Sequence, residues 1–153
     1  MSVINDVRVA ISADAGQVAR LFDLYRCSYG RESNLSESAD FISERLKNND
    51  SVIFIVENDD GVLAEFTQLY PIFSSISAKK AWVLNDLFVC REFRSQGVAS
   101  KLIQQSLAFC QNSGAEWVSL QTATDNFTAQ QLYQKLGFIQ DIQFLNYYYN
   151  FTV

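Results

Sequence analysis

The sequence predicts an α+β fold in which helices cover both faces of one mixed sheet, an αβα layered arrangement. Short runs that alternate or are wholly apolar indicate strands, and apolar residues spaced three and four apart indicate helices. Turn residues separate the two kinds of segment. The chain has 153 residues, of which 48 % are hydrophobic and 19 % are charged. Because this length and composition suit one globular core, we expect residues 1–153 to form a single domain.

Strand patterns occur along the whole chain, and they predict a mostly antiparallel sheet of about six or seven strands. The segment 51–56 is apolar on both faces, and a hairpin turn joins it to an antiparallel partner, 62–70. Pro71 and the serines after it are expected to end that strand. A helix connects 81–89 to 116–122, so those two strands should be parallel. The other strand segments are 7–11 and 138–151, the second long enough for two strands.

Four segments have the spacing of amphipathic helices. Ser12 or Asp14 can cap the first, and Asp125 can cap the last, which ends at Gly137. The expected buried stripes are Val18, Leu21, Phe22 and Tyr25; Ala39, Ile42 and Leu46; Ala99, Leu102, Ile103, Leu107 and Cys110; and Ala129, Leu132, Tyr133 and Leu136.

Charge and residue types exclude several classes of function. The net charge of −5 favours cationic partners over nucleic acid, although it also fits a surface that only keeps the protein soluble. The absence of histidine removes imidazole bases, His-dependent triads and the usual zinc sites, and we expect no metal. Cys27, Cys90 and Cys110 have no metal-like spacing and are expected to be buried thiols in a reducing compartment. Without a signal peptide or an apolar run of membrane length, the expected location is the cytoplasm.

The segment Arg94-Ser95-Gln96-Gly97-Val98-Ala99 falls where a strand ends and a helix begins. Free backbone N–H groups and the helix dipole meet at such a point, so a pyrophosphate would fit there. Small residues at Gly97 and Ala99 let an anion approach the backbone. The Gly-Lys-Ser/Thr ending of a P-loop and the Gly-x-Gly-x-x-Gly spacing of dinucleotide folds are both absent. The alternative is a plain helix N-terminus whose glycine serves packing.

This segment, with its neighbours, resembles the GCN5-related N-acetyltransferase (GNAT) family. That family has Arg/Gln-x-x-Gly-x-Gly/Ala after a strand, which here reads Arg94-x-x-Gly97-x-Ala99. Leu84-Asn85-Asp86-Leu87-Phe88-Val89 resembles the preceding fourth strand, and Asn126-x-x-Ala129-x-x-x-Tyr133-x-x-x-Gly137-Phe138 resembles a second family motif. The phrase 82–89 is most similar to polyamine and Hpa2-like small-molecule acetyltransferases. The resemblance implies a GNAT fold whose sheet opens between its fourth and fifth strands.

The resemblance also implies that acetyl-coenzyme A is the co-substrate. Leu87, Phe88 and Val89 would pair with pantetheine as if it were another strand. Asn126 would bond the pantetheine arm, and Ala129 would leave it room. Arg94 would assist the phosphates or form a surface ion pair instead. Backbone N–H groups in the loop and the first helical turn would take the pyrophosphate, from Ser95, Gln96, Gly97, Val98, Ala99 and Ser100.

Three positions are implied or expected to take part in acetyl transfer. Tyr133 is the candidate general acid, because a neutral phenol with a pKa of about 10 can protonate the departing thiolate; the alternative is a tyrosine that packs in the core. The N–H of Leu87 would polarise the acetyl carbonyl. Asp86 or an ordered water would be the base. Relatives commonly carry an acid where this chain has Asn85, which could instead orient the substrate or a water.

The expected activity is therefore direct acetyl transfer to a primary amine, with a small molecule as the acceptor. The alternatives are a non-catalytic acyl-coenzyme A sensor, and a peptide N-terminal or lysine acetyltransferase. The tail 144–151 is apolar on both faces and should be covered, either at a central sheet position or in a homodimer interface. No membrane partner is expected.

Overall fold

The computed structural model describes residues 5–152. They form two compact units, one ending at Gln121 and the other beginning at Thr122. The first unit holds a five-stranded sheet in the order β1-β2-β3-β4-β5. Its strands are β1 (Arg8–Val9), β2 (Val52–Glu57), β3 (Leu63–Ser74), β4 (Lys79–Val89) and β5 (Val118–Ser119). Strands β1 to β4 pair antiparallel with one another in this order, and β4 pairs with β5 in parallel, which confirms the expected mixed sheet.

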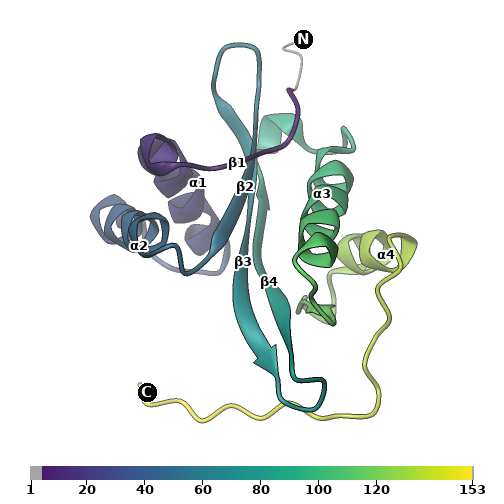
Figure 1. Cartoon of the computed structure of the whole chain (residues 1–153). Helices are drawn as coiled ribbons and strands as arrows, with labels where there is room; N and C mark the ends of the chain where they lie inside the picture. Colours follow the sequence, from purple (N-terminus) through teal and green to yellow (C-terminus); the bar gives the residue numbers. More distant parts are fainter. Residues whose placement is uncertain (1–4, 153) are drawn as a thin grey trace. The chain divides into compact units, whose positions relative to one another are not determined.

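The helices of the first unit cover both faces of the sheet. Helices α1 (Ala15–Ser28) and α2 (Leu35–Asn48) lie on one face and α3 (Val98–Asn112) lies on the other (Figure 1). Two short 3-10 turns, Ser12–Asp14 and Arg91–Phe93, precede α1 and α3. This arrangement confirms the αβα layers. The main core lies between α1 and the sheet, where Val18 and Leu21 pack with Ile55 and Phe66.

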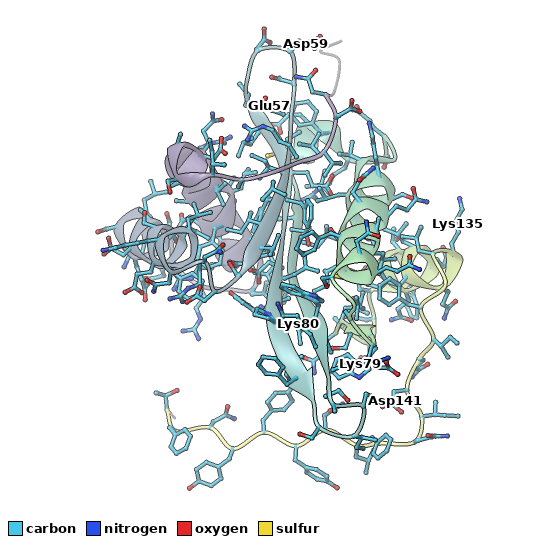
Figure 2. All side chains as sticks on the ribbon, viewed as in Figure 1. Glu57, Asp59, Lys79, Lys80, Lys135 and Asp141 are labelled. Carbon is cyan, nitrogen blue, oxygen red and sulfur yellow. The ribbon has the colours of Figure 1, made fainter. Side chains whose placement is uncertain are left out.

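Local chemistry explains the ends of several elements. Asn34 caps α2 by accepting a hydrogen bond from the N–H of Glu37. Asn58 closes the β2–β3 turn, since its side-chain oxygen accepts from the N–H groups of Asp60 and Val62. Figure 2 shows Asp59 at this turn and Lys79 and Lys80 at the opposite end of the long strands.

Two expectations about the sheet were wrong. Strand β3 continues through Pro71 to Ser74 instead of ending at the proline. Strand β2 pairs with β3 only as far as Leu69, so Pro71 lies where β3 has no neighbour on that side and its missing N–H breaks no ladder. Strand β5 covers only Val118–Ser119 rather than 116–122.

The second unit contains helix α4 (Phe127–Lys135), and its cap also differs from the expectation. Asn126, not Asp125, caps α4 by accepting from the N–H of Ala129 at 3.2 Å. At the other end of the helix, Gly137 has the positive φ of 97° expected at that position.

The tail after α4 contains no strand within the described residues, contrary to the strand expected over 138–151. A strand needs a partner for its backbone groups, and no backbone ladder involving residues 139–152 is found in the described chain. Its aromatic side chains are instead exposed, Tyr147 by 87 % and Phe151 by 92 %. The described sheet therefore has five strands rather than six or seven.

Candidate active site

Strand β4 has one open backbone edge. On one side it pairs with β3 along its length, whereas on the other side β5 pairs only with Trp82 and Val83. From Leu84 to Val89 no described strand neighbours β4 on the β5 side. The sheet thus opens between the fourth and fifth strands, as the resemblance implied. Leu87, Phe88 and Val89 lie on this open edge and are half-buried.

The loop after β4 leads into an uncapped helix. Ser95 and Gly97 both adopt left-handed backbone conformations, with φ values of 63° and 75°. Gly97 is the N-cap of α3, and no side chain accepts a hydrogen bond there. The first-turn N–H groups, which start at Val98, therefore lack a side-chain acceptor and can face an anion. The positive φ explains why glycine suits this position.

Arg94 contacts the strand rather than open space. Its Nε donates to the carbonyl oxygen of Val89 at 3.2 Å, and its guanidinium lies 6.0 Å from the centre of the Phe88 ring. These contacts link the loop to the open edge of β4. The two cofactor-binding segments predicted from the sequence, 87–89 and 94–100, are thus adjacent in the first unit.

A β-bulge places Asn85 and Asp86 at the start of this open edge. Gln68 pairs with Asp86 and Leu69 pairs with Leu84, so Asn85 is the extra residue on β4. Asn85 is exposed, whereas Asp86 is 2 % exposed. The bulge therefore presents one polar residue to solvent and buries the next.

The Asp86 carboxylate is held by two amide groups. Gln68 Nε2 donates to its Oδ2 at 2.6 Å, and Asn85 Nδ2 donates to its Oδ1 at 2.9 Å. Burial raises the pKa of Asp86, while these hydrogen bonds act in the opposite direction. A buried carboxyl with a raised pKa is better suited to accept a proton near neutrality than an exposed one.

Sequence reasoning missed two residues that orient Asp86. Ser51 Oγ donates to Gln68 Oε1 at 2.9 Å, which fixes the amide so that its NH₂ group faces Asp86. Both side chains are buried. A polar residue at position 68 inside an apolar strand was the available signal, but its partner depends on a bulged register that the sequence does not reveal.

Tyr25 is the third residue to which sequence reasoning gave no role, although it begins the segment 25–38 that the family resemblance implies for acceptor binding. It was expected in a buried stripe of α1, and its ring does pack against Phe66 with centroids 6.1 Å apart. Its hydroxyl, however, donates to the carbonyl oxygen of Asn85 at 3.2 Å. Burial and the nearby Asp86 charge raise the pKa of Tyr25 well above its usual value, so the phenol stays neutral.

The motif on α4 belongs to the second unit and is described by itself. Ala129 and Tyr133 are four residues apart and share one face of the helix. The half-buried Tyr133 ring packs edge-on against Phe138, with centroids 5.8 Å apart. The Asn126 side-chain oxygen is engaged in the cap. Within the first unit, segment 94–100 contacts the end of β4, the strand that also carries Asn85 and Asp86. The roles of Asn126, Ala129 and Tyr133 stay predictions.

Other chemistry finds little support in the described chain. Cys90 and Cys110 are buried, and burial raises the pKa of the Cys110 thiol to about 11. A thiol with that pKa is a poor nucleophile near neutral pH. Within residues 5–152 no three Cys, Asp or Glu side chains gather as metal ligands. None of the described helices is long and apolar enough to span a membrane.

Comparison with known proteins identifies the class to which this arrangement belongs. The model of the acetyltransferase (GNAT) family matches residues 18–138. The uncharacterized N-acetyltransferase YhfO of Bacillus subtilis (strain 168) is 39 % identical over 145 residues, which are 95 % of this chain and 97 % of that protein. The crystal structure of a probable acetyltransferase is 35 % identical, with a TM-score of 0.92 over 97 % of this chain and 99 % of the other.

A more distant relative is similar over a shorter segment. N-alpha-acetyltransferase 30 of Schizosaccharomyces pombe is 41 % identical over 66 residues, 43 % of this chain and 44 % of that protein. The open β4 edge and the uncapped α3 provide unpaired backbone groups and an anion-binding helix end. The family match and the nearly full-length relative then show that the chain belongs to the GNAT family. Enzymes of this family use acetyl-coenzyme A.

Proposed function

We propose that the protein transfers the acetyl group of acetyl-coenzyme A to a primary amine of a small molecule, by direct attack in a ternary complex. The observation that carries this proposal is the buried Asp86 carboxylate, held by Gln68 and Asn85 where the open edge of β4 begins. A base at that point directly precedes Leu87, the first residue of the edge expected to hold the thioester. Its negative charge also suits an acceptor that arrives as an ammonium ion.

The residues of the first unit suit the co-substrate. Backbone groups of Leu87, Phe88 and Val89 would bind pantetheine along the open edge, and the Leu87 N–H would polarise the acetyl carbonyl. The N–H groups from Ser95 to Ser100, which include the uncapped first turn of α3, would bind the pyrophosphate. Coenzyme A supplies the activated thioester. Asp86 accepts the amine proton through an intervening group, or an ordered water accepts it, and the exposed Asn85 amide orients the acceptor.

The roles proposed in the second unit rest on the family motif. Asn126 bonds the pantetheine arm, Ala129 leaves it space and the Tyr133 phenol protonates the departing thiolate. Tyr133→Phe keeps the ring and removes the hydroxyl, so kcat should fall by about 10²–10⁴-fold while acetyl-coenzyme A affinity is kept. The rate of free-thiol release measures kcat, and isothermal titration calorimetry measures the affinity for acetyl-coenzyme A. Unchanged kcat would remove Tyr133 from the mechanism.

The acceptor class is tested by a panel of amines. Polyamines, amino acids, aminoglycosides and a set of short peptides should be incubated with acetyl-coenzyme A, and free thiol and acetylated product should be measured. We expect turnover with a small amine. Because N-alpha-acetyltransferase 30 is 41 % identical over 66 residues, a peptide N-terminus is the second candidate acceptor. Turnover with peptides alone would replace the small-molecule proposal, and no turnover with any amine would overturn both.

We also propose that the tail of one copy lies against a second copy in a homodimer. Large apolar side chains are exposed along this segment, namely Ile139, Ile142, Phe144, Leu145, Tyr147, Tyr149 and Phe151. A buried aromatic side chain covers about 150–250 Å², so covering this segment would remove roughly 1,000 Å² from each copy. That area is in the range of a stable interface.

The three free cysteines fit a reducing compartment such as the cytoplasm.

A further inference from the structure

The proposed base is too deeply buried to receive a proton from the acceptor directly. Asp86 is 2 % exposed, and each of its carboxylate oxygens already accepts a hydrogen bond from a neighbouring amide. Neither amide can pass a proton along, because a side-chain NH₂ group does not titrate near neutral pH. A proton that leaves an amine at the surface therefore needs another group to carry it to Asp86.

The Tyr25 hydroxyl occupies the position where such a carrier is needed. It donates to the carbonyl oxygen of the exposed bulge residue Asn85 at 3.2 Å, on the solvent side of the network. Asp86 directly follows Asn85 in the chain, so the hydroxyl also lies near this carboxylate: burial and then the Asp86 charge raise the pKa of Tyr25, and Tyr25 in turn lowers that of Asp86. A hydroxyl can accept one proton while it donates another, as an amide cannot.

Packing holds the Tyr25 side chain in place. Its ring meets Phe66 edge-on at 6.1 Å and Tyr29 edge-on at 5.1 Å, and it stacks on Phe22 at 6.4 Å between ring centroids. These contacts come from both α1 and β3, so the hydroxyl keeps its place above the bulge. A group held in position in this way loses little freedom when it transfers a proton.

The remaining titratable groups near Asp86 do not compete for this role. Tyr70 on β3 feels the Asp86 charge, but no described hydrogen bond joins it to the exposed bulge residue Asn85, as one joins Tyr25. Arg45 and Asp50 form an ion pair with each other at 2.9 Å, and their charges act on Tyr70. Gln68 is fixed by Ser51. Tyr25 is thus the hydroxyl that connects Asp86 to the exposed side of the bulge.

We propose that Tyr25 relays the proton of the acceptor amine to Asp86, with Gln68 and Ser51 as positioning residues. The proposal rests on the proposed function, in which Asp86 is the base. The Tyr25 hydroxyl, which donates to the Asn85 carbonyl at rest, turns toward Asp86. As the amine N–H bond breaks, its proton forms a new bond to Tyr25 Oη, the original Tyr25 O–H bond breaks, and that proton bonds to the Asp86 carboxylate. The electron pair left on nitrogen attacks the thioester carbonyl. The phenol stays neutral throughout, and Asp86 returns its proton to solvent by the reverse path.

The test uses Tyr25→Phe, which keeps the aromatic packing and removes the hydroxyl. We expect kcat/KM for the amine to fall by about 10²–10⁴-fold, as for loss of an acid–base group. Acetyl-coenzyme A affinity and thermal stability should stay near the wild-type values. Tyr70→Phe is the matched control, because it removes a phenol that also feels Asp86 but has no part in the relay, and it should keep wild-type kcat/KM.

A double-mutant cycle separates a relay from a structural role. In a relay the two groups act on one proton, so Tyr25→Phe combined with Asp86→Asn should be no slower than Asp86→Asn alone. In the wild type, kcat/KM should fall as the pH drops through the raised pKa of Asp86, because the base becomes protonated. This pH dependence should vanish in Tyr25→Phe. Full activity of Tyr25→Phe, or additive losses in the double variant, would overturn the relay while leaving acetyl transfer intact. A wild-type protein that acetylates no amine would overturn the proposed function and the relay with it.

Discussion

Two buried carboxyl groups on β3 and β4 differ in their partners. Asp86 accepts hydrogen bonds from two amides, whereas both oxygens of Glu65 lack a partner and the residue is 0 % exposed. Glu65 pairs across the sheet with Val56 and Val89 and alternates with Phe66, so it faces α3 rather than α1. Burial alone raises the pKa of Glu65 to about 8.

This raised pKa makes stability depend on pH. The folded protein keeps Glu65 protonated up to about pH 8, whereas the unfolded chain ionises it near its ordinary pKa of 4.5. Between these values the folded state binds more protons, so the free energy of unfolding falls as pH rises through that window, in total by a few kcal/mol. Asp86 also has a raised pKa and adds a slope of the same sign.

Glu65→Gln should therefore stabilise the protein at pH 8 and flatten, without abolishing, the decline in stability between pH 5 and pH 8. Chemical denaturation at several pH values measures both effects. Glu32→Gln makes the same change at an exposed position and should keep the wild-type slope. An equal slope in wild type and Glu65→Gln would show that Glu65 is ionised in the folded protein.

The residues of the site differ in how far the sequence could predict them. Asp86 was found because an acid in an apolar strand is costly to bury without a role. Gln68 and Tyr25 were not, because each meets Asp86 or Asn85 through contacts 18 to 60 positions apart in the chain. Such contacts depend on a bulged strand register and on the packing of α1, neither of which local periodicity determines.

At the scale of elements, the loop before α3 carries the expected phosphate site. Gly97 has a φ of 75°, and a Cβ added there would meet no atom within 4 Å. Substitution would therefore cost backbone strain rather than a clash, about 1–2 kcal/mol. Gly114 follows α3 with a φ of 78° and equally open space, which makes it a matched position outside the site.

Gly97→Ala and Gly114→Ala should lower thermal stability by similar amounts. Only Gly97→Ala should weaken acetyl-coenzyme A binding, by about tenfold, because the loop relieves its strain by turning the N–H groups away from the phosphates. Calorimetry and thermal unfolding of both variants measure these effects. Equal affinity of Gly97→Ala and wild type would place the pyrophosphate elsewhere.

Elements that are defined by local pattern were predicted well. The four α-helices and the β2–β3 hairpin follow from apolar spacing, caps and turn residues, and they lie close to the expected ranges. The tail was mispredicted because its aromatic, β-prone residues indicate a strand, but a strand exists only where another strand offers backbone partners. Pro71 was mispredicted for a related reason, since whether it faces a neighbour depends on where β2 ends.

At the scale of the whole molecule, the tail predicts the oligomeric state. Sedimentation of the wild type should show a dimer, and Tyr147→Asp with Phe151→Asp should shift it toward the monomer because a charged group opposes burial of these apolar positions. Ile76→Asp alters an equally exposed apolar residue in the β3–β4 turn and should leave the dimer intact. A wild type that sediments as a monomer at all concentrations would rule out the dimer.

The central claim is that the open edge of β4 and the N-terminus of α3 bind acetyl-coenzyme A. Isothermal titration calorimetry of the purified full chain with acetyl-coenzyme A tests it without knowledge of the acceptor. We predict one saturable site per chain, with a dissociation constant between roughly 1 μM and 1 mM, the usual range of substrate affinities. Absence of binding to the folded protein at millimolar acetyl-coenzyme A would contradict the account.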